Sequence, residues 1–548
     1  MAAPRAQRTP VPLPDGRGSV GDGRGSLTAP APKRLATNLL FLMAGEFTAK
    51  LLTFATFSYL ARTLGPRDYG FVEFTLALMV FFTLPVDLGL GSYGAREIAR
   101  NPDRAPQLLH EVTGLRLFLS VCSMAALGVL ILFLHQSHRL KELLILYGVS
   151  LVGAPFLLQW LFQGHDQMRW VALTEIVRQI GFAGLVLLTF RRGTPLWHIG
   201  IIEFASVAGA VLFCAYVTRL ELRFAWPWPD LKVSRLMGHL RESAPIGLTE
   251  LAWGFMWYFS TVLLGVVFSD ATLGWWGASH RALMALHTFV WRYFFNLLPS
   301  ISLCALRSKE DLLELMGESV RFTSWVGLLA GGLLMATAPD LLALLYGPNF
   351  RQAARSFSVL VWMLPVAMLS GHHRYILIAY RRQGRLLFCT SLSAASAVIL
   401  GLILVPRYDG PGAAWALLIA NTINLALVYL SVKQLVVEVP VLPQLAAPLA
   451  ALAAAAVLFL ALFRVNYWIA LAAAFAVYGA SFTWVYGRRL ASILRSAAKG
   501  TVLAQIATGT RRSPLPVTPS YRGTTATARE WSTGEFGLPE RTRAPAGA

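Results

Sequence analysis

The sequence of 548 residues contains few charged residues and little cysteine. Asp, Glu, Lys and Arg make up 14% of the chain, whereas soluble domains contain about 25%. This shortage excludes an ordinary water-soluble domain as the main body of the chain. The four cysteines show neither a CxxC motif nor a metal-binding spacing, and we interpret them as small apolar residues; they are Cys122, Cys214, Cys304 and Cys389.

The sequence motifs of several enzyme classes are missing as well. The chain has no phosphate-binding GxxxxGK[ST] motif, no nucleophile elbow, and no sizeable soluble segment that could hold a nucleotide-sugar fold. Four histidines of the apolar segments lack the i, i+4 spacing with a supporting carboxylate that helical zinc sites use; they are His280, His287, His372 and His373. We therefore expect no catalytic residues, no cofactor and no metal site.

Long apolar segments dominate what is present. Hydrophobic residues make up 56% of the chain, and the mean hydropathy is +0.56. A bilayer core about 30 Å thick requires about 20 apolar residues per helix. Runs of this length predict an all-α membrane protein with about fourteen transmembrane helices. They cover residues 38–61, 71–91, 112–134, 143–162, 170–190, 198–217, 245–268, 275–298, 319–338, 356–380, 386–405, 412–432, 442–463 and 467–486.

The arrangement of these segments suggests an internal duplication with parallel repeats. Six spans form an N-terminal lobe (37–218), a basic linker follows (219–243), and six more spans form a C-terminal lobe (244–434). Two further spans occupy 435–490, and the polar tails 1–36 and 491–548 are expected to be disordered. The net charge of +20 lies mainly at the edges of apolar segments. Connectors on one side hold roughly twice the basic residues of the other, which predicts that both termini are cytoplasmic.

Ionisable residues inside the predicted spans are candidate functional residues, because each costs about 2.5 to 3.5 kcal/mol to insert. A basic residue without a local partner requires a water-filled cavity or an anionic ligand, and Arg281 and Arg292 fit this description best. Arg292 could instead extend its side chain towards the interface. Glu46 with Lys50, and Glu175 with Arg178, could simply neutralise each other. Other interior charges include Glu73, Asp87, Glu203, Glu250 and Arg374.

Several connectors resemble those of a known family. The segment Arg62-Thr63-Leu64-Gly65-Pro66-Arg67-Asp68-Tyr69-Gly70 is followed by Asp87-Leu88-Gly89-Leu90 and by Arg96-Glu97-Ile98-Ala99-Arg100. Phe162-Gln163-Gly164, Leu345-Tyr346-Gly347 and Pro406-Arg407-Tyr408 agree with the same pattern. The pattern resembles the Wzx-type polysaccharide flippases of the multidrug/oligosaccharidyl-lipid/polysaccharide exporter superfamily. The glycines mark turns and close helix packing, so they indicate the fold rather than the substrate.

The resemblance implies two six-helix lobes in a V shape, plus two C-terminal helices, in a bacterial cytoplasmic membrane. It also implies that alternating access exports an undecaprenyl-pyrophosphate-linked oligosaccharide for surface polysaccharide biosynthesis. The candidates for a cationic cavity are Lys50, Arg178, Arg281, Arg292 and Arg374, and the candidates for ion coupling are Glu46, Asp87 and Glu250.

The expected partners are the lipid-linked oligosaccharide, membrane lipids, and a polymerase and glycosyltransferases; no nucleic acid is expected. Three alternatives remain open at this point: a lipid II flippase, a cation-coupled multidrug antiporter of the same superfamily, and a non-transporting scaffold of a polysaccharide-synthesis complex. The sugar, the coupling ion and the oligomeric state do not follow from the sequence.

Overall fold

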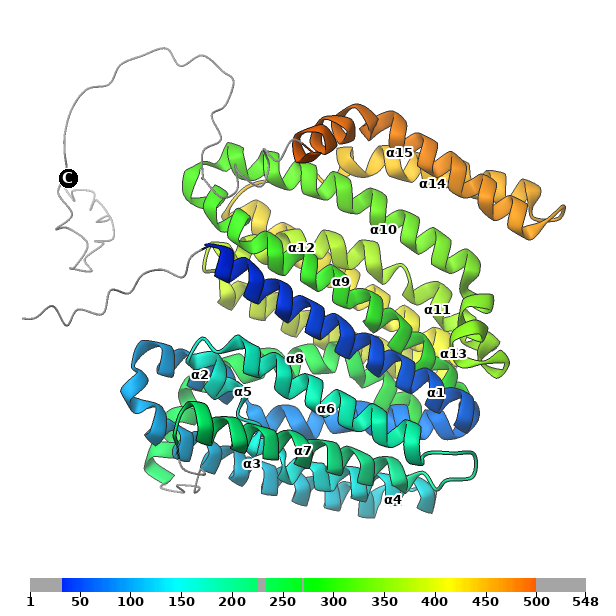
Figure 1. Ribbon diagram of the computed structural model, residues 1–548. Helices are drawn as coiled ribbons and strands as arrows, with labels where there is room; N and C mark the ends of the chain where they lie inside the picture. The colour runs from blue at the N-terminus through cyan, green and yellow to red at the C-terminus, as the bar shows by residue number, and fades with distance from the viewer. Residues whose placement is uncertain (1–31, 225–232, 269–270, 499–548) are drawn as a thin grey trace, which may run out of the picture. The chain divides into compact units, whose positions relative to one another are not determined.

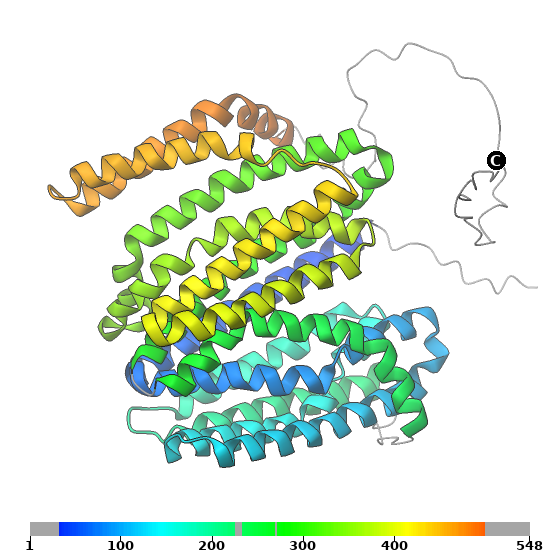
Figure 2. The same cartoon turned by 180° about the vertical axis from the view of Figure 1, so that it is seen from behind.

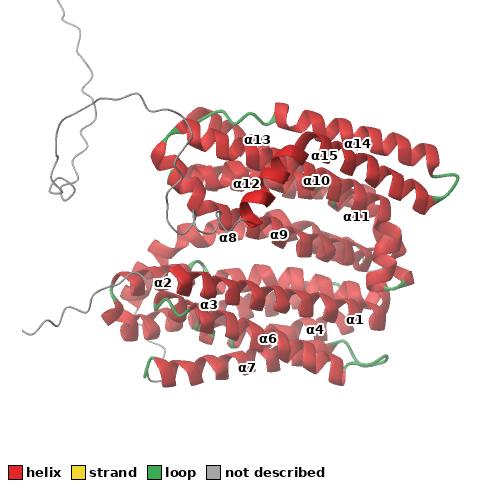
Figure 3. Cartoon of the chain, turned by 45° about the horizontal axis from the view of Figure 1, so that its top comes forward, coloured by secondary structure: helices red, strands yellow, loops and turns green. Residues whose placement is uncertain are grey.

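The computed structural model describes residues 32–224, 233–268 and 271–498, with side chains for 50–224, 237–268 and 271–487. The chain divides into two compact units, Met1–Arg488 and Arg489–Ala548, and every described side chain belongs to the first. All regular elements in the described part are helices (Figures 1 and 3), so the predicted all-α membrane fold is confirmed. The long helices are α1 (Pro32–Asp87), α3 (Ala105–Phe133), α6 (Met168–Thr189), α7 (Trp197–Glu221), α8 (Val233–Val267), α9 (Ala271–Arg307), α10 (Lys309–Tyr346), α12 (Met363–Ala379), α13 (Gln383–Leu435), α14 (Leu442–Leu462) and α15 (Tyr467–Ala498).

Two of these helices contain two predicted spans each. The backbone of α1 leaves helical geometry at Gly65, where φ is 73°, and that of α13 does so at Asp409, where φ is 50°. Glycine adopts a positive φ without steric cost, which explains the break predicted at Gly65-Pro66. Twelve helical stretches of the described residues are long and apolar enough to cross a membrane. Because two of them are 51 and 53 residues long, the count of about fourteen stays a prediction.

Some helix boundaries differ from the predicted ones. Residues 143–162 were expected to form one helix, but they form the end of α4 (His138–Gly148), two 3₁₀ turns and α5 (Gln159–Gly164). Gly148, Gly153 and Pro155 interrupt the helix at this point. Conversely, α8 begins at Val233 and continues through Pro245, which we expected to start the helix. Neighbouring helices allow proline inside a membrane helix.

The irregular backbone between α4 and α5 is stabilised by side chains of α3. Ser120 donates a hydrogen bond to the carbonyl oxygen of Leu151 at 2.7 Å, and Arg116 donates one to that of Leu157 at 3.2 Å. In a membrane, carbonyl groups outside a helix need such partners because water is absent. The short helix α2 (Leu90–Arg100), which the sequence reading treated as a connector, packs against α5.

The helices form two packed sets, which we call the first group (α1–α7) and the second group (α8–α13). In the first group, α6 packs against both α1 and α7. In the second group, α13 packs against α8 and α12, as Figure 2 shows from behind. The groups meet mainly where α1 contacts α8 and α9 (Figure 1). A large apolar core cluster extends across both groups, and it includes Phe57, Trp276 and Phe357.

The contact between α1 and α9 depends on glycine. A Cβ atom on Gly274 would lie 1.8 Å from the carbonyl oxygen of Pro66, and one on Gly70 would lie 2.8 Å from the backbone nitrogen of Gly274. Only glycine permits this approach of two backbones. Farther along, α9 carries Gly277 opposite Glu73, so the second segment of α1 (66–87) and α9 run in the same direction.

The last two apolar helices dock on α10. The Tyr478 hydroxyl donates a hydrogen bond to the carbonyl oxygen of Trp325 at 2.8 Å, and the Tyr467 hydroxyl donates one to that of Ala336 at 3.0 Å. Trp325 and Tyr478 are both buried, together with Ala451 of α14. These helices therefore contact the second group through α10.

Candidate functional site

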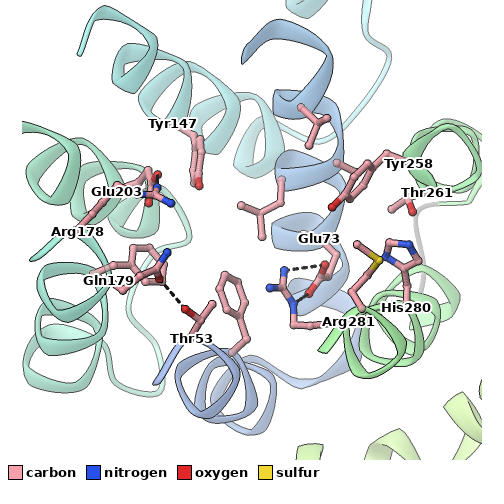
Figure 4. Close-up of a pocket in the computed structure, with 16 residues that line it drawn as sticks. Thr53, Glu73, Tyr147, Arg178, Gln179, Glu203, Tyr258, Thr261, His280 and Arg281 are labelled. Atoms are coloured by element: carbon pink, nitrogen blue, oxygen red, sulfur yellow. Dashed lines mark hydrogen bonds and ion pairs between the residues drawn. The ribbon is translucent and has the colours of Figure 1, made fainter. Parts of the chain in front are cut away.

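A cavity of about 260 Å³, the first cavity, lies among α1, α4, α6, α7, α8 and α9. Figure 4 shows two polar clusters on opposite sides of it. One cluster belongs to the first group and includes Arg178, Gln179 and Glu203; the other joins Glu73 to Arg281. Phe57, Phe182 and Met284 supply apolar surface.

The cluster in the first group is a closed network of ion pairs. Arg178 donates to Glu203 at 3.1 Å and to Glu175 at 3.3 Å. Gln179 donates to Glu175 at 2.9 Å, and Thr53 donates to the side-chain oxygen of Gln179 at 2.7 Å. Glu175 and Arg178 therefore form an ion pair with each other, which is one of the two possibilities that the sequence left open. Glu203 is a second partner of the arginine.

The second cluster is a bidentate ion pair. Arg281 on α9 donates through Nε to Oε1 of Glu73 at 2.5 Å and through Nη2 to Oε2 at 3.0 Å. The Tyr69 hydroxyl donates to Oε1 of the same carboxylate at 2.5 Å. The guanidinium carbon lies 3.5 Å from the centre of the Phe57 ring. The expectation that Arg281 lacks a partner is therefore wrong, because Glu73, 208 residues away in sequence, supplies one.

A larger cavity of about 580 Å³, the second cavity, adjoins the first and shares Thr53, Tyr258, Arg281 and Met284 with it. Its walls come from α1, α8, α9, α10 and α11 (Ala354–Leu360) and are mostly apolar. Three basic side chains line it, namely Lys50, Arg281 and Arg292, and none of the described residues that line it is acidic. An anionic ligand with an apolar part fits this lining, because burial strengthens charge attraction and apolar walls accept hydrocarbon.

The remaining candidates lie elsewhere. Asp87 forms an ion pair with Arg116 at 3.2 Å and accepts a hydrogen bond from the backbone of Gly91 at 3.3 Å. Glu250 and Arg374 interact electrostatically with each other and line neither cavity. The side chain of Glu46 lies outside the described residues. The structure thus brings together Lys50, Arg281 and Arg292, with Arg178 across the first cavity, and the assigned roles of all eight candidates stay predictions.

The histidines of the second group are hydrogen-bonded or packed against aromatic rings. His372 shares one hydrogen bond with the Ser319 hydroxyl at 2.7 Å and another with the carbonyl oxygen of Met368 at 2.8 Å. His280 stacks on Trp276 with ring centres 5.6 Å apart. Among the residues with described side chains, no three His, Cys, Asp or Glu gather in a way that could hold a metal ion.

Sequence reasoning did not single out Glu73, Tyr69 or Gly277 as parts of the site. Glu73 was one of several interior charges without an assigned role, and Tyr69 was part of a connector motif. A usable signal was the glycine pair Gly274 and Gly277, because small residues spaced three apart on an apolar helix mark a close helix contact. That signal identifies the face of α9 but not the partner.

Comparison with known proteins gives three consistent findings. Residues 35–303 match the family described as polysaccharide biosynthesis protein. A protein of Escherichia coli K12 named "Putative O-antigen transporter" is 23% identical over 420 residues, which cover 73% of this chain and 97% of that protein. A protein of Shigella dysenteriae with the same name is 25% identical over 253 residues, covering 45% of this chain and 62% of that protein.

Among solved structures, the lipid II flippase MurJ in an inward closed conformation superposes with a TM-score of 0.66 at 15% identity, covering 82% of this chain and 100% of that one. An inward-facing multidrug transporter of the MATE family superposes with a TM-score of 0.59 at 15% identity, covering 71% of this chain and 94% of that one. At these identities the likeness shows the fold alone.

Proposed function

We infer that this chain is a member of the polysaccharide-transporter branch of the multidrug/oligosaccharidyl-lipid/polysaccharide exporter superfamily and moves a lipid-linked oligosaccharide across the bacterial cytoplasmic membrane. The observation that supports this substrate class is the second cavity, whose described lining combines apolar walls with three basic side chains and no acidic one. A polyprenyl pyrophosphate has the matching chemistry, since it joins two charged phosphates to a hydrocarbon chain.

The proposed binding mode follows from this lining. Lys50, Arg281 and Arg292 would pair with the pyrophosphate, while apolar residues of α10 and α11 would contact the first isoprene units. Arg178, across the first cavity, would contact the attached sugar. Charge-assisted bonds from arginine to phosphate are among the strongest available to a protein. The volume of about 580 Å³ lies within the range of about 300 to 1,000 Å³ for small-molecule sites.

Alternating access is the proposed mechanism, with the two helix groups moving relative to each other about the contact of α1 with α8 and α9. With both termini cytoplasmic, an inside-negative potential would favour export of the anionic headgroup by about 2.3 kcal/mol per charge per 100 mV. Glu46, Asp87 and Glu250 remain the candidates for ion coupling, and Arg374 would then respond to the charge of Glu250. A polysaccharide polymerase and glycosyltransferases are the proposed protein partners.

The alternatives differ in what they require of the cavity. A multidrug antiporter for organic cations requires acidic lining, which the described residues of the second cavity do not provide. A non-transporting scaffold does not need three basic groups around a cavity. A lipid II flippase would use the same pyrophosphate chemistry, so the cavity does not separate it from an O-antigen type of substrate.

The test is charge reversal at Arg281 in a strain that depends on this chain for surface polymer. Arg281→Glu should abolish surface polysaccharide when the variant is compared with the unmodified protein at matched membrane abundance. Arg192→Glu, on the exposed connector between α6 and α7, is the matched control and should preserve export. Normal polymer export by the Arg281 variant would refute the proposal, and cell lysis on depletion of the chain would identify a lipid II flippase instead. Flipping of the lipid-linked substrate by the purified chain in liposomes would exclude a scaffold role.

A further inference from the structure

The ion pair between Glu73 and Arg281 connects the two helix groups. Glu73 lies on the second segment of α1, in the first group, and Arg281 lies on α9, in the second. The side chain of Glu73 is 7% exposed and that of Arg281 is 20% exposed. Gly277, one turn before Arg281, makes room for the glutamate, since a Cβ there would lie 2.3 Å from Cγ of Glu73. The absence of a side chain at Gly277 therefore leaves the space beside α9 that Glu73 occupies.

Arg281 is also the only charged residue that lines both cavities among the residues whose side chains are described. The carboxylate of Glu73 occupies the Nε and Nη2 edge of its guanidinium. That edge is one of the two through which a guanidinium can make a bidentate contact with a phosphate. An oxyanion that enters the second cavity and binds at this edge would compete with Glu73 for the same donors.

Other charged contacts between the groups are not accessible to a ligand in this way. Arg62 donates to the carbonyl oxygens of Leu344 and Leu345, and His239 contacts Glu111 at 2.9 Å. The charged residues of these contacts, Arg62, His239 and Glu111, line neither cavity. Arg178 lines the first cavity, but its partner Glu175 lies on the same helix, α6, within one group.

We propose that Glu73 is a coupling residue: it holds Arg281, and with it the second helix group, until the anionic headgroup of the substrate displaces its carboxylate. This inference rests on the proposed function, because it takes the second cavity as the headgroup site. When the headgroup binds Arg281, it replaces the carboxylate of Glu73. The ion pair between the two helix groups is therefore lost in the same step. An empty transporter keeps the pair and stays closed at this contact, whereas a loaded one is released to rearrange.

The experiment uses the full chain in lipid nanodiscs, with inorganic pyrophosphate as the probe. It measures both the affinity for pyrophosphate and the distance between the two helix groups. Glu73→Gln keeps the shape of the side chain but removes the charge that competes for Arg281. Its affinity for pyrophosphate should rise at least about tenfold, the size expected when a charged hydrogen-bonded competitor is removed. A residue with a merely structural role would lower the affinity or leave it unchanged.

The geometry is read from the distance between spin labels at Arg192, in the first group, and Arg355, in the second, with the four native cysteines replaced by alanine. Both positions are exposed. In the unmodified chain, pyrophosphate should shift the distance distribution, and in Glu73→Gln the shifted distribution should be present without the probe. Glu175→Gln is the matched control, because it removes a carboxylate from an ion pair within one group and should leave the distance distribution unchanged.

The outcomes separate the two proposals. Equal pyrophosphate affinity in Glu73→Gln and the unmodified chain, or an unshifted distance in the variant, would overturn the coupling role and leave the proposed function standing. No pyrophosphate binding to either form would overturn the proposed function and the coupling role with it. If Glu73→Gln does not fold, Tyr69→Phe provides the same test, since it removes the hydrogen bond that holds the carboxylate and should raise the affinity by a smaller factor.

Discussion

Replacing Gly277 by alanine should break the Glu73–Arg281 pair without touching either charged residue. The added Cβ would lie 2.3 Å from Cγ and 2.7 Å from Cβ of Glu73, whereas carbon atoms approach to about 3.5 Å at closest. The glutamate side chain must therefore move by about 1.2 Å or more. A displacement of that size would lengthen the 3.0 Å contact from Nη2 to Oε2 beyond hydrogen-bond range.

The expected loss of stability follows from two opposing effects. Breaking a buried ion pair costs about 3 to 5 kcal/mol when one partner is left uncompensated. Replacing a helical glycine by alanine stabilises a protein by about 0.4 to 1 kcal/mol where the backbone allows it. The variant should therefore be about 2 to 4 kcal/mol less stable than the unmodified chain. The midpoint of thermal unfolding in detergent, compared at a fixed scan rate, measures this difference.

Gly184→Ala is the matched control, because a Cβ at Gly184 in the middle of α6 meets nothing within 4 Å. It should be as stable as the unmodified chain or slightly more so. In a Glu73→Gln background, Gly277→Ala should cost at least about 1 kcal/mol less than in the unmodified chain, since no buried charge is then displaced. Unfolding of Gly277→Ala at the temperature of the Gly184 control would refute the reasoning.

Three further changes test other parts of the fold. Tyr478→Phe removes a buried hydrogen bond to Trp325 and should destabilise the docking of the last two helices by about 0.5 to 1.5 kcal/mol, measured as faster proteolysis of α14 and α15. His239→Ala leaves the buried carboxylate of Glu111 with one partner fewer, and hydrogen exchange at the start of α8 should accelerate by about tenfold; unchanged exchange would contradict a structural role for this contact. Gly65→Ala places a side chain at a φ of 73° and should cost about 1 to 2 kcal/mol, visible as a lower unfolding temperature; an unchanged temperature would show that the backbone at this turn adapts.

Most of the fold was predictable because a bilayer restricts the possible structures. Apolar runs of about 20 residues predict helices directly, since a backbone in lipid must satisfy its own hydrogen bonds. The same reasoning failed where other parts of the protein satisfy the backbone instead. Ser120 and Arg116 stabilise the broken helix after Gly148, and neighbouring helices accommodate Pro245 inside α8. In both places the stabilising partners lie on other helices, so the local sequence does not reveal them.

The site was predictable only in part. The cost of burying charge identified Lys50, Arg281 and Arg292 as candidates, and the structure gathers them around one cavity. The partner of Arg281 was not predictable, because Glu73 lies 208 residues away and helical periodicity gives no information about pairs between helices. Arg374 and Asp87 satisfy the same burial criterion but lie outside both cavities, since a charge inside a span can also pair locally, as Asp87 does with Arg116.

The ring of Phe57 lies under the guanidinium of Arg281 and belongs to the same helix group as Glu73. A cation–π contact of this kind contributes about 0.5 to 2 kcal/mol, and it involves the face of the guanidinium rather than the edge that Glu73 occupies. In the proposed coupling, displacement of Glu73 by the headgroup would therefore leave the arginine still in contact with the ring of Phe57. Under that proposal, Phe57 would oppose separation of the two helix groups even after the headgroup has bound, because its contact with Arg281 also joins the groups.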